Sequence, residues 1–167
     1  FGSGILNSME LPLLVEVLAA ILVLDLAIWF QHVLSHKIPV FWRFHRVHHA
    51  DNDFDASTAL RFHPFEIVLS GAYKFLVVIL LGPTVLAVIL FEIILNASSL
   101  FNHANLVLPR WLDRALRAIL VTPDMHRVHH SVHRSEHDMN YGFCLSVWDR
   151  VFRTYRAYPM DGHQHMK

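Results

Sequence analysis

The stretch FEIVLSGAYKFLVVILLGPTVLAVILFEIILNASSLF, residues 65–101, is predominantly apolar and decides the fold. Gly82-Pro83 interrupts it near the middle, and this pair of residues is typical of a turn. The arms on either side, 65–81 and 84–101, are each close to the shortest length of a membrane-spanning helix, about 17 residues. The stretch therefore predicts two spanning helices joined by a tight turn, unless the chain crosses the membrane only once.

The apolar pattern alone leaves that single crossing open. Residues 75–95 could form one span that is kinked at Pro83 and leaves Lys74 outside. The histidines help to choose, because His63 lies just before the apolar stretch and His103 just after it. If both lie near one metal site, the chain has to enter the membrane and return to the same side. We therefore expect a helical hairpin.

A second apolar run, residues 11–30, precedes the hairpin and is broken only by Pro12, Glu16 and Asp25. As a helix it would be about 30 Å long, which matches the hydrocarbon thickness of a bilayer. A buried core helix is the alternative, but so little polar surface in a chain of this size favours a membrane span. Carboxylates inside membranes are rare and usually functional.

The composition sets the class of protein. The chain has 167 residues, enough for one domain, with 54% hydrophobic residues and a mean hydropathy of +0.36. Basic and acidic residues balance at 14 each, so nothing points to nucleic acid, and the single Cys144 excludes an intrachain disulfide framework. The first residue is Phe1, which is typical of a segment of a longer protein, and no signal peptide is expected because no basic region precedes the first apolar run.

The basic residues predict the orientation. With a hairpin, every Lys and Arg except Lys74 lies on the histidine side, which the positive-inside rule makes cytoplasmic. Residues 111–121 have helical amphipathic spacing and could lie at the membrane interface or on the surface of a cap. We expect an all-α integral membrane protein with about three membrane helices and a cytosolic, histidine-rich helical cap. The expected layout is a single domain, 1–167, with a span at 11–30, a hairpin at 65–101 and a metal-binding cap formed by 31–64 and 102–160.

The histidines are the unusual feature of the sequence. HRVHH occurs at 45–49 and again at 126–130, so each copy places its histidines at i, i+3 and i+4 on one helix face. His32 and His36 are spaced i, i+4. Neutral imidazole is the commonest nitrogen ligand of metals, and eight such groups exceed what one metal takes, so two metals are expected. A structural zinc site is less fitting, because such sites are usually four-coordinate and often use Cys. Imidazole also suits iron and copper.

Six motifs resemble one family. FQHVLSH, WRFHRVHHAD, RFHPFE, FNHANLVLP, TPDMHRVHHS and NYGFCLSVWDRVFRTY occur in this order over about residues 25–160. Together they resemble the fatty acid hydroxylase / sterol desaturase superfamily of membrane di-iron enzymes. The resemblance implies two irons, with zinc as a possible substitute after purification, that activate O2 and attack an unactivated C–H bond of a lipid. It also implies a separate electron donor of the cytochrome b5, ferredoxin or reductase type.

The resemblance also implies the ligands. The metal ligands would be His32, His36, His45, His48, His49, His103, His126, His129 and His130. His63 is a possible ligand or near-metal residue. Some members carry a further histidine where this chain has Ser99, so one ligand is absent or supplied by water. Arg153 stands where the family usually has Gly, which puts the local turn in doubt.

Polar residues near the histidines are candidates for orienting them, since a ligating histidine usually donates its outer N–H to a carboxylate or carbonyl. The candidates are Asp25, Asp124, Asp138, Asn140 and Asp149. His133 and His137 lie near the last box, and His163 and His165 lie in the tail. Glu92 and Asn96, one turn apart, could seal the hairpin or line a substrate path.

The sequence therefore predicts a membrane di-iron oxygenase that hydroxylates, or desaturates, a fatty acyl chain or sterol. Hydroxylation is favoured because the resemblance is closer to the hydroxylases. A non-catalytic metal-binding membrane protein is the alternative, and a soluble helical metalloprotein whose apolar runs form its core is a third reading.

Overall fold

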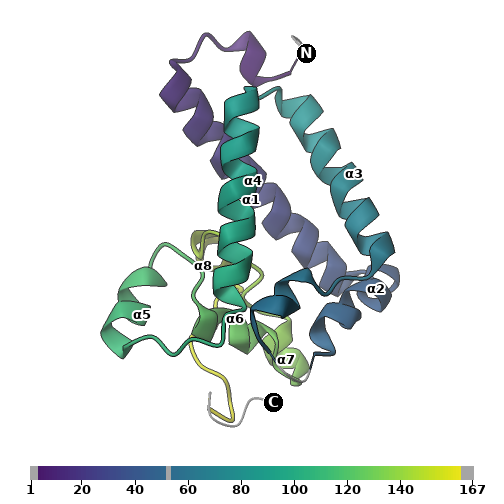
Figure 1. Ribbon diagram of the computed structural model, residues 1–167, viewed down its shortest axis with the longest axis vertical. Helices are drawn as coiled ribbons and strands as arrows, with labels where there is room; N and C mark the ends of the chain where they lie inside the picture. Colours follow the sequence, from purple (N-terminus) through teal and green to yellow (C-terminus); the bar gives the residue numbers. More distant parts are fainter. Residues whose placement is uncertain (1–3, 52–53, 163–167) are drawn as a thin grey trace.

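The computed structural model describes residues 4–51 and 54–162, which form helices and no strand. Three long helices lie at one end of the molecule, and all the short helices except the N-terminal one gather at the other end, which we call the cap (Figure 1). The long helices are α1 (Leu13–Lys37), α3 (Pro64–Leu81) and α4 (Val85–Asn102). The remaining elements are η1 (Leu6–Ser8), α2 (Pro39–His49), η2 (Ala56–Leu60), α5 (Arg110–Leu116), α6 (Pro123–His129), α7 (Arg134–His137) and α8 (Val147–Val151).

The three long helices are each long and apolar enough to cross a membrane. The prediction of a span followed by a hairpin is therefore confirmed in the described residues, including the turn at Gly82-Pro83. Gly82 ends α3 with φ of 64°, a left-handed conformation that glycine adopts without strain. A side chain at Gly82 would also collide with Asn7 and Gly4, which pack against the turn.

Glu16 ties α1 to the tip of the hairpin. Its two carboxylate oxygens accept hydrogen bonds from the backbone N–H and the hydroxyl of Thr84, each 2.8 Å long. Thr84 is the N-cap of α4, so the carboxylate supports the start of that helix. One of the two carboxylates that interrupt the first apolar run thus has a structural partner inside the bundle.

Helix α1 continues beyond the predicted span of 11–30 and ends only at Lys37. It stops there because Pro39 disfavours the helical conformation of the preceding residue, Ile38. Pro39 is also the first residue of α2, a position that proline favours. His32 and His36 therefore project from the last turns of a rigid spanning helix rather than from a loop.

The hairpin arms pack unequally. Helix α4 lies against α1 through a core that includes Val17, Ala20 and Leu24 of α1 with Ala87 and Phe91 of α4. Helix α3 diverges from α4 in Figure 1 and approaches α1 toward the cap, and only 6% of its apolar window is buried. The outer face of α3 is thus left for lipid, and residues of α1, α3 and α4 line a cavity between these helices.

The amphipathic helix predicted at 111–121 is shorter than expected, since α5 ends at Leu116. The next residues pair with another segment instead of continuing the helix. The Val121 N–H donates to the Cys144 carbonyl at 3.0 Å, the Ser146 N–H donates to the Ile119 carbonyl at 2.9 Å, and Leu120 forms an antiparallel bridge with Leu145. This pairing joins the segment after α5 to the segment before α8.

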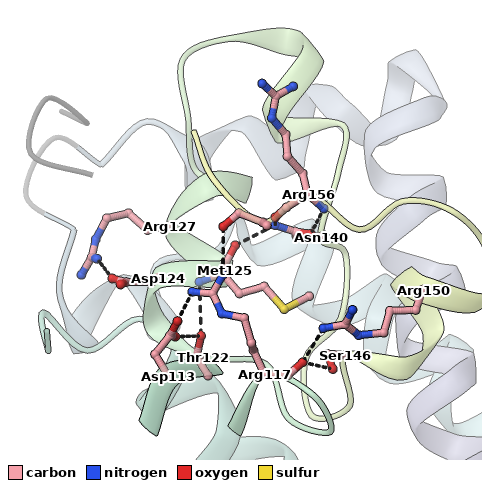
Figure 2. A network of polar contacts seen from close by, with 11 residues as sticks. Asp113, Arg117, Thr122, Asp124, Met125, Arg127, Asn140, Ser146, Arg150 and Arg156 are labelled. Atoms are coloured by element: carbon pink, nitrogen blue, oxygen red, sulfur yellow. Dashed lines mark hydrogen bonds and ion pairs between the residues drawn. The ribbon is translucent and has the colours of Figure 1, made fainter. Parts of the chain in front are cut away.

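The polar network of Figure 2 holds the same two segments together. The Arg117 carbonyl accepts from the Ser146 hydroxyl at 2.8 Å and from the Arg150 guanidinium at 2.9 Å. The Arg117 guanidinium in turn pairs with Asp113, which also accepts from the Thr122 hydroxyl.

The turn at Arg153 has a left-handed φ of 61°, although the family that the sequence resembles usually has glycine there. A residue with a side chain adopts this conformation at a cost of about 1 kcal/mol.

Candidate metal centre

Two adjoining clusters contain the nine histidines that were predicted as ligands. Within each cluster, one nitrogen from every histidine lies within 4.8 Å of the others. Cluster A consists of His32, His36, His45, His49 and His129. Cluster B consists of His48, His103, His126 and His130. The clusters touch, because the rings of His49 and His130 stack with centroids 4.4 Å apart.

The two HRVHH copies are divided between the clusters in opposite ways. The first copy, on α2, sends its i, i+4 pair His45 and His49 to cluster A and its intervening His48 to cluster B. The second copy, which starts on α6, sends His126 and His130 to cluster B and His129 to cluster A. Each helix thus contributes to both clusters, which explains why the motif occurs twice.

Hydrogen bonds fix the ring orientation of four cluster histidines. The Nδ1 of His32 donates to the Tyr141 carbonyl at 2.7 Å, and that of His129 donates to the Met139 carbonyl at 2.8 Å. In cluster B, Nδ1 of His103 donates to the Ser99 carbonyl at 2.7 Å. Nδ1 of His45 lies 2.5 Å from the Glu66 carboxylate. These bonds place the proton of each neutral ring on Nδ1 and leave Nε2 as an acceptor.

Pairs of Nε2 atoms lie close together in both clusters. His32 and His45 face each other with Nε2 atoms 3.0 Å apart, although both carry their proton on Nδ1. Nε2 of His103 lies 3.1 Å from Nε2 of both His48 and His126. In the His32–His45 pair both Nε2 atoms present lone pairs, which repel at this distance unless a cation lies between them, so this pair fits bound metal.

Unsatisfied nitrogens support the same fit. In the described residues, buried nitrogens without a hydrogen-bond partner occur in His36, His48, His49, His126, His129 and His130. Unpaired buried polar atoms are costly, and native proteins rarely leave them without a partner. A metal ion would satisfy those that face the interior of a cluster. An all-imidazole donor set of this kind suits iron, copper or zinc.

Burial also keeps the imidazoles neutral, which is the form that binds metal. Loss of hydration lowers the pKa of His45 to about 3 and that of His103 to about 4. The pKa values of His126 and His130 are depressed well below the usual value, first by burial and then by neighbouring imidazoles. The clusters are therefore uncharged before metal binds.

The carboxylates of Asp25 and Asp149 do not bond to imidazoles, contrary to the prediction. Asp25 accepts from the Trp148 indole at 2.8 Å and from the backbone N–H groups of Cys144 and Leu145 at 3.3 and 3.2 Å. Asp149 accepts from the Trp29 indole, the Thr154 hydroxyl and the N–H groups of Tyr141 and Gly142, at 2.7–3.0 Å. Both carboxylates affect the histidines only indirectly. They hold in place the segment whose Tyr141 carbonyl orients the His32 ring.

Three further polar candidates have different surroundings. Asp124 forms an ion pair with Arg127, and the Asn140 amide donates to the Met125 and Arg156 carbonyls at 2.9 and 2.8 Å (Figure 2). Neither contacts an imidazole through these bonds. Asp138 comes closest to the predicted role, with its Oδ1 3.8 Å from Nδ1 of His36, and it also pairs with Lys37 at 2.9 Å.

The remaining histidines of the described residues lie outside both clusters. His63 is the N-cap of α3, and its Nδ1 accepts from the Phe65 N–H at 3.2 Å. His133 lies 2.6 Å from Asp161, and His137 lies beside His36 and Asp138 at the edge of cluster A. His163 and His165 are outside the described residues. Ser99 contributes its carbonyl to His103, so the position of the family's further histidine still borders cluster B.

Glu66 is the functional candidate that the sequence analysis missed. It lies in the first turn of α3, partly buried beside cluster A, and its carboxylate bonds to His45 of α2. The motif RFHPFE contains this residue, so the signal was present, but the contact joins two helices and has no sequence spacing to reveal it. The carbonyls of Tyr141, Met139 and Ser99 could not be found from sequence, since every residue has a carbonyl.

Replacing Glu66 by glutamine tests the role of this carboxylate. The neutral amide of glutamine lacks the negative charge that strengthens the hydrogen bond from His45. We therefore expect metal affinity to fall by about 10–100-fold, as for other groups that orient metal ligands. Metal retention during titration with a chelator measures the effect. Glu10→Gln, at an exposed position before α1, is the control. Equal retention in both variants would rule out the role assigned to Glu66.

Three apolar helices capped by two clusters of buried histidines define a class of helical, histidine-rich membrane proteins. The sequence model of the fatty acid hydroxylase family matches residues 17–154, so this chain belongs to that family. No solved structure matches the chain significantly.

Three relatives show what the chain is similar to. It is 31% identical to human alkylglycerol monooxygenase over 146 residues, which cover 83% of this chain and 30% of the relative. It is 26% identical to the ornithine lipid hydroxylase of Rhizobium tropici, with 89% of this chain and 44% of the relative covered. It is 28% identical to human cholesterol 25-hydroxylase, with 88% and 53% covered. The chain thus spans about a third to a half of the length of these relatives.

Proposed function

We propose that this chain forms the oxygenase centre of a membrane lipid hydroxylase. It would bind two irons, one in each histidine cluster, and convert a C–H bond of a lipid to an alcohol with one oxygen atom of O2. The facing Nε2 atoms of His32 and His45 carry the proposal, because both rings hold their proton on Nδ1 and two lone pairs 3.0 Å apart repel unless a cation lies between them. The three relatives support the lipid substrate, since each is named as a lipid hydroxylase or monooxygenase.

The ligand assignment follows the geometry. All five histidines of cluster A and all four of cluster B would hold metal, while His63 would not. A bound iron pair would supply the activation of O2. Two electrons and two protons from a separate donor of the cytochrome b5, ferredoxin or reductase type balance the reaction, with water as the second product.

The chain's own residues would orient the ligands, exclude water and admit the lipid. Glu66 and the Tyr141 carbonyl hold the His45 and His32 rings in position. The Phe62 ring covers cluster B, since it stacks on His48 with ring centroids 4.2 Å apart, and Phe54 lies against His130. Cluster A is open on one side, where His32 and His45 border a cavity of about 440 Å³ between the long helices. The lipid would therefore reach the centre from the cluster A side.

The topology belongs to the same proposal. The chain would act as a single domain with α1 and the α3–α4 hairpin in the membrane and the cap on the cytoplasmic side. The basic residues support this orientation, because among those that the structure describes all except Lys74 lie on the side of the cap.

Labelled oxygen tests the function. The iron-loaded protein in lipid nanodiscs, supplied with a chemical reductant and ¹⁸O2, is expected to give an alcohol that carries one ¹⁸O atom, detected by mass spectrometry. An unlabelled product would mean that the oxygen comes from water, and an alkene would show desaturation instead. Stoichiometric iron without any lipid product would support the non-catalytic metal-binding alternative.

A further inference from the structure

Two cavities adjoin each other along α1 and α3. The inner cavity, about 440 Å³, reaches His32 and His45 of cluster A. The outer cavity, about 360 Å³, touches no cluster histidine and is lined mainly by apolar side chains of α1, α2 and α3. Both sizes fall within the range of about 300–1,000 Å³ that is typical of ligand sites. The wall that the cavities share consists of Gln31, Ser35, Glu66 and Ser70, all of them polar.

Several polar side chains of the membrane helices line the inner cavity, although polar groups within such helices are costly. Besides the shared wall, Lys74 of α3 and Asn96 and Ser99 of α4 line it. Polar side chains within membrane helices are rare and usually mark a site for a substrate or ion. Here they line the space beside cluster A, so they would contact a substrate that lies at the metal centre.

The charges of the inner cavity already have partners. Lys74 forms an ion pair with Glu92 at 2.6 Å, and Glu66 bonds to His45. An ionic head group in this cavity would therefore lack a counter-charge in a low-dielectric site, which is costly. Hydroxyl and amide groups, by contrast, can bond to Asn96, Ser99 and Ser35.

The outer cavity has the opposite character. Phe41, Phe44, Leu69 and Leu76 line it. It lies beside the loosely packed α3, and Leu69 and Leu76 are 48% and 53% exposed on the face left for lipid. A hydrocarbon chain can therefore enter it sideways from the bilayer without crossing the cap.

We propose that the two cavities bind one single-chain amphiphile, with an uncharged hydroxyl- or amide-bearing head group in the inner cavity and its hydrocarbon tail in the outer one. Binding would exchange the hydrogen bond between the Gln31 amide and the Ser70 hydroxyl, in the shared wall, for bonds to the ligand. This inference specifies the substrate class of the proposed function. It depends on that function only for the reaction, and not for the binding. The carbon that lies at cluster A would then be close to the head group and not at the far end of the tail.

Equilibrium binding to the metal-loaded protein without O2 tests this assignment. The tritiated probes are N-hexadecanoylethanolamine, its octanoyl analogue, and hexadecanoate, which has the same tail length but an anionic head. Ala72→Phe fills the outer cavity, and Val68→Phe adds the same ring to an exposed position of α3 that lines neither cavity. Asn96→Leu makes the inner cavity less polar.

We expect the uncharged long-chain probe to bind about tenfold or more tightly than hexadecanoate, a difference of about 1.4 kcal/mol. Ala72→Phe should weaken the long-chain probe by a similar factor and leave the octanoyl probe nearly unchanged, whereas Val68→Phe should affect neither. Asn96→Leu should reduce the preference for the uncharged head group. Tighter binding of hexadecanoate, or equal effects of the two Phe variants, would overturn the assignment.

The binding test is separate from the test of the proposed function. If the binding pattern holds but no labelled alcohol forms, the two cavities bind an amphiphile in a protein that is not an oxygenase. If labelled alcohol forms but binding ignores Ala72→Phe, the oxygenase stands and the substrate lies elsewhere.

Discussion

Replacing His48 by alanine is expected to empty cluster B and to abolish lipid oxidation. Cluster B has only four histidines, and Nε2 of His48 lies 3.1 Å from Nε2 of His103, so the change removes a quarter of the donor set. We expect activity to fall by more than about a hundredfold, because removal of groups that merely orient a ligand already costs up to this factor. The readouts are product formation and metal bound per chain.

His63→Ala is the matched control, because His63 caps α3 and belongs to neither cluster. It should keep both metals and most of the activity, with at most a small loss of stability from the weakened cap. Unchanged metal content and turnover in His48→Ala would remove cluster B from the catalytic centre. Loss of metal in His63→Ala would show that the ligand assignment is incomplete.

Replacing Asp149 by alanine is expected to cause the largest loss of stability. This carboxylate is fully buried and accepts from Trp29, Thr154 and two backbone N–H groups of the segment that orients His32. Burial raises its pKa above the usual value, although the hydrogen bonds oppose that shift. Removing it leaves four donors unpaired, so we expect a loss of about 3–5 kcal/mol, as for breaking a buried polar network.

Thermal unfolding in detergent, followed by circular dichroism, measures this loss. Asp124→Ala is the control within the same cap, since Asp124 has one partner, the neighbouring Arg127 on the same helix. An i, i+3 pair of this kind contributes at most about 1 kcal/mol. If the two variants melt at the same temperature, Asp149 does not hold the cap together.

Local sequence signals predicted the fold of the membrane part. Gly82-Pro83 marked the turn of the hairpin, and the placement of His63 and His103 at its two ends chose a hairpin over one kinked span. Helix α1 extends beyond the predicted span of 11–30, because apolar content marks the part that can lie in the membrane whereas the helix continues until Pro39 breaks it. The end of α5 was wrong for a different reason, since residues 119–121 pair with a segment that is distant in sequence.

The site was predicted as a set of residues but not as an arrangement. Helical spacing showed that each HRVHH copy places its histidines on one face, yet the division between clusters depends on how α2 and α6 approach α1. Asp25 illustrates the limit of spacing arguments. It lies two turns from His32 on the same helix, but its carboxylate meets the backbone of residues 144 and 145. Glu66 was missed because its bond to His45 exists only after α2 and α3 pack.

The metal content of the purified protein tests the central claim most directly. The protein is loaded with iron under anaerobic conditions in detergent, and iron and zinc are counted per chain for the unmodified chain, His48→Ala and His129→Ala. We expect about two irons per chain, with a sharp fall in each variant, because the two residues belong to different clusters. No stoichiometric metal, or one metal that neither substitution affects, would contradict a two-metal centre built from clusters A and B.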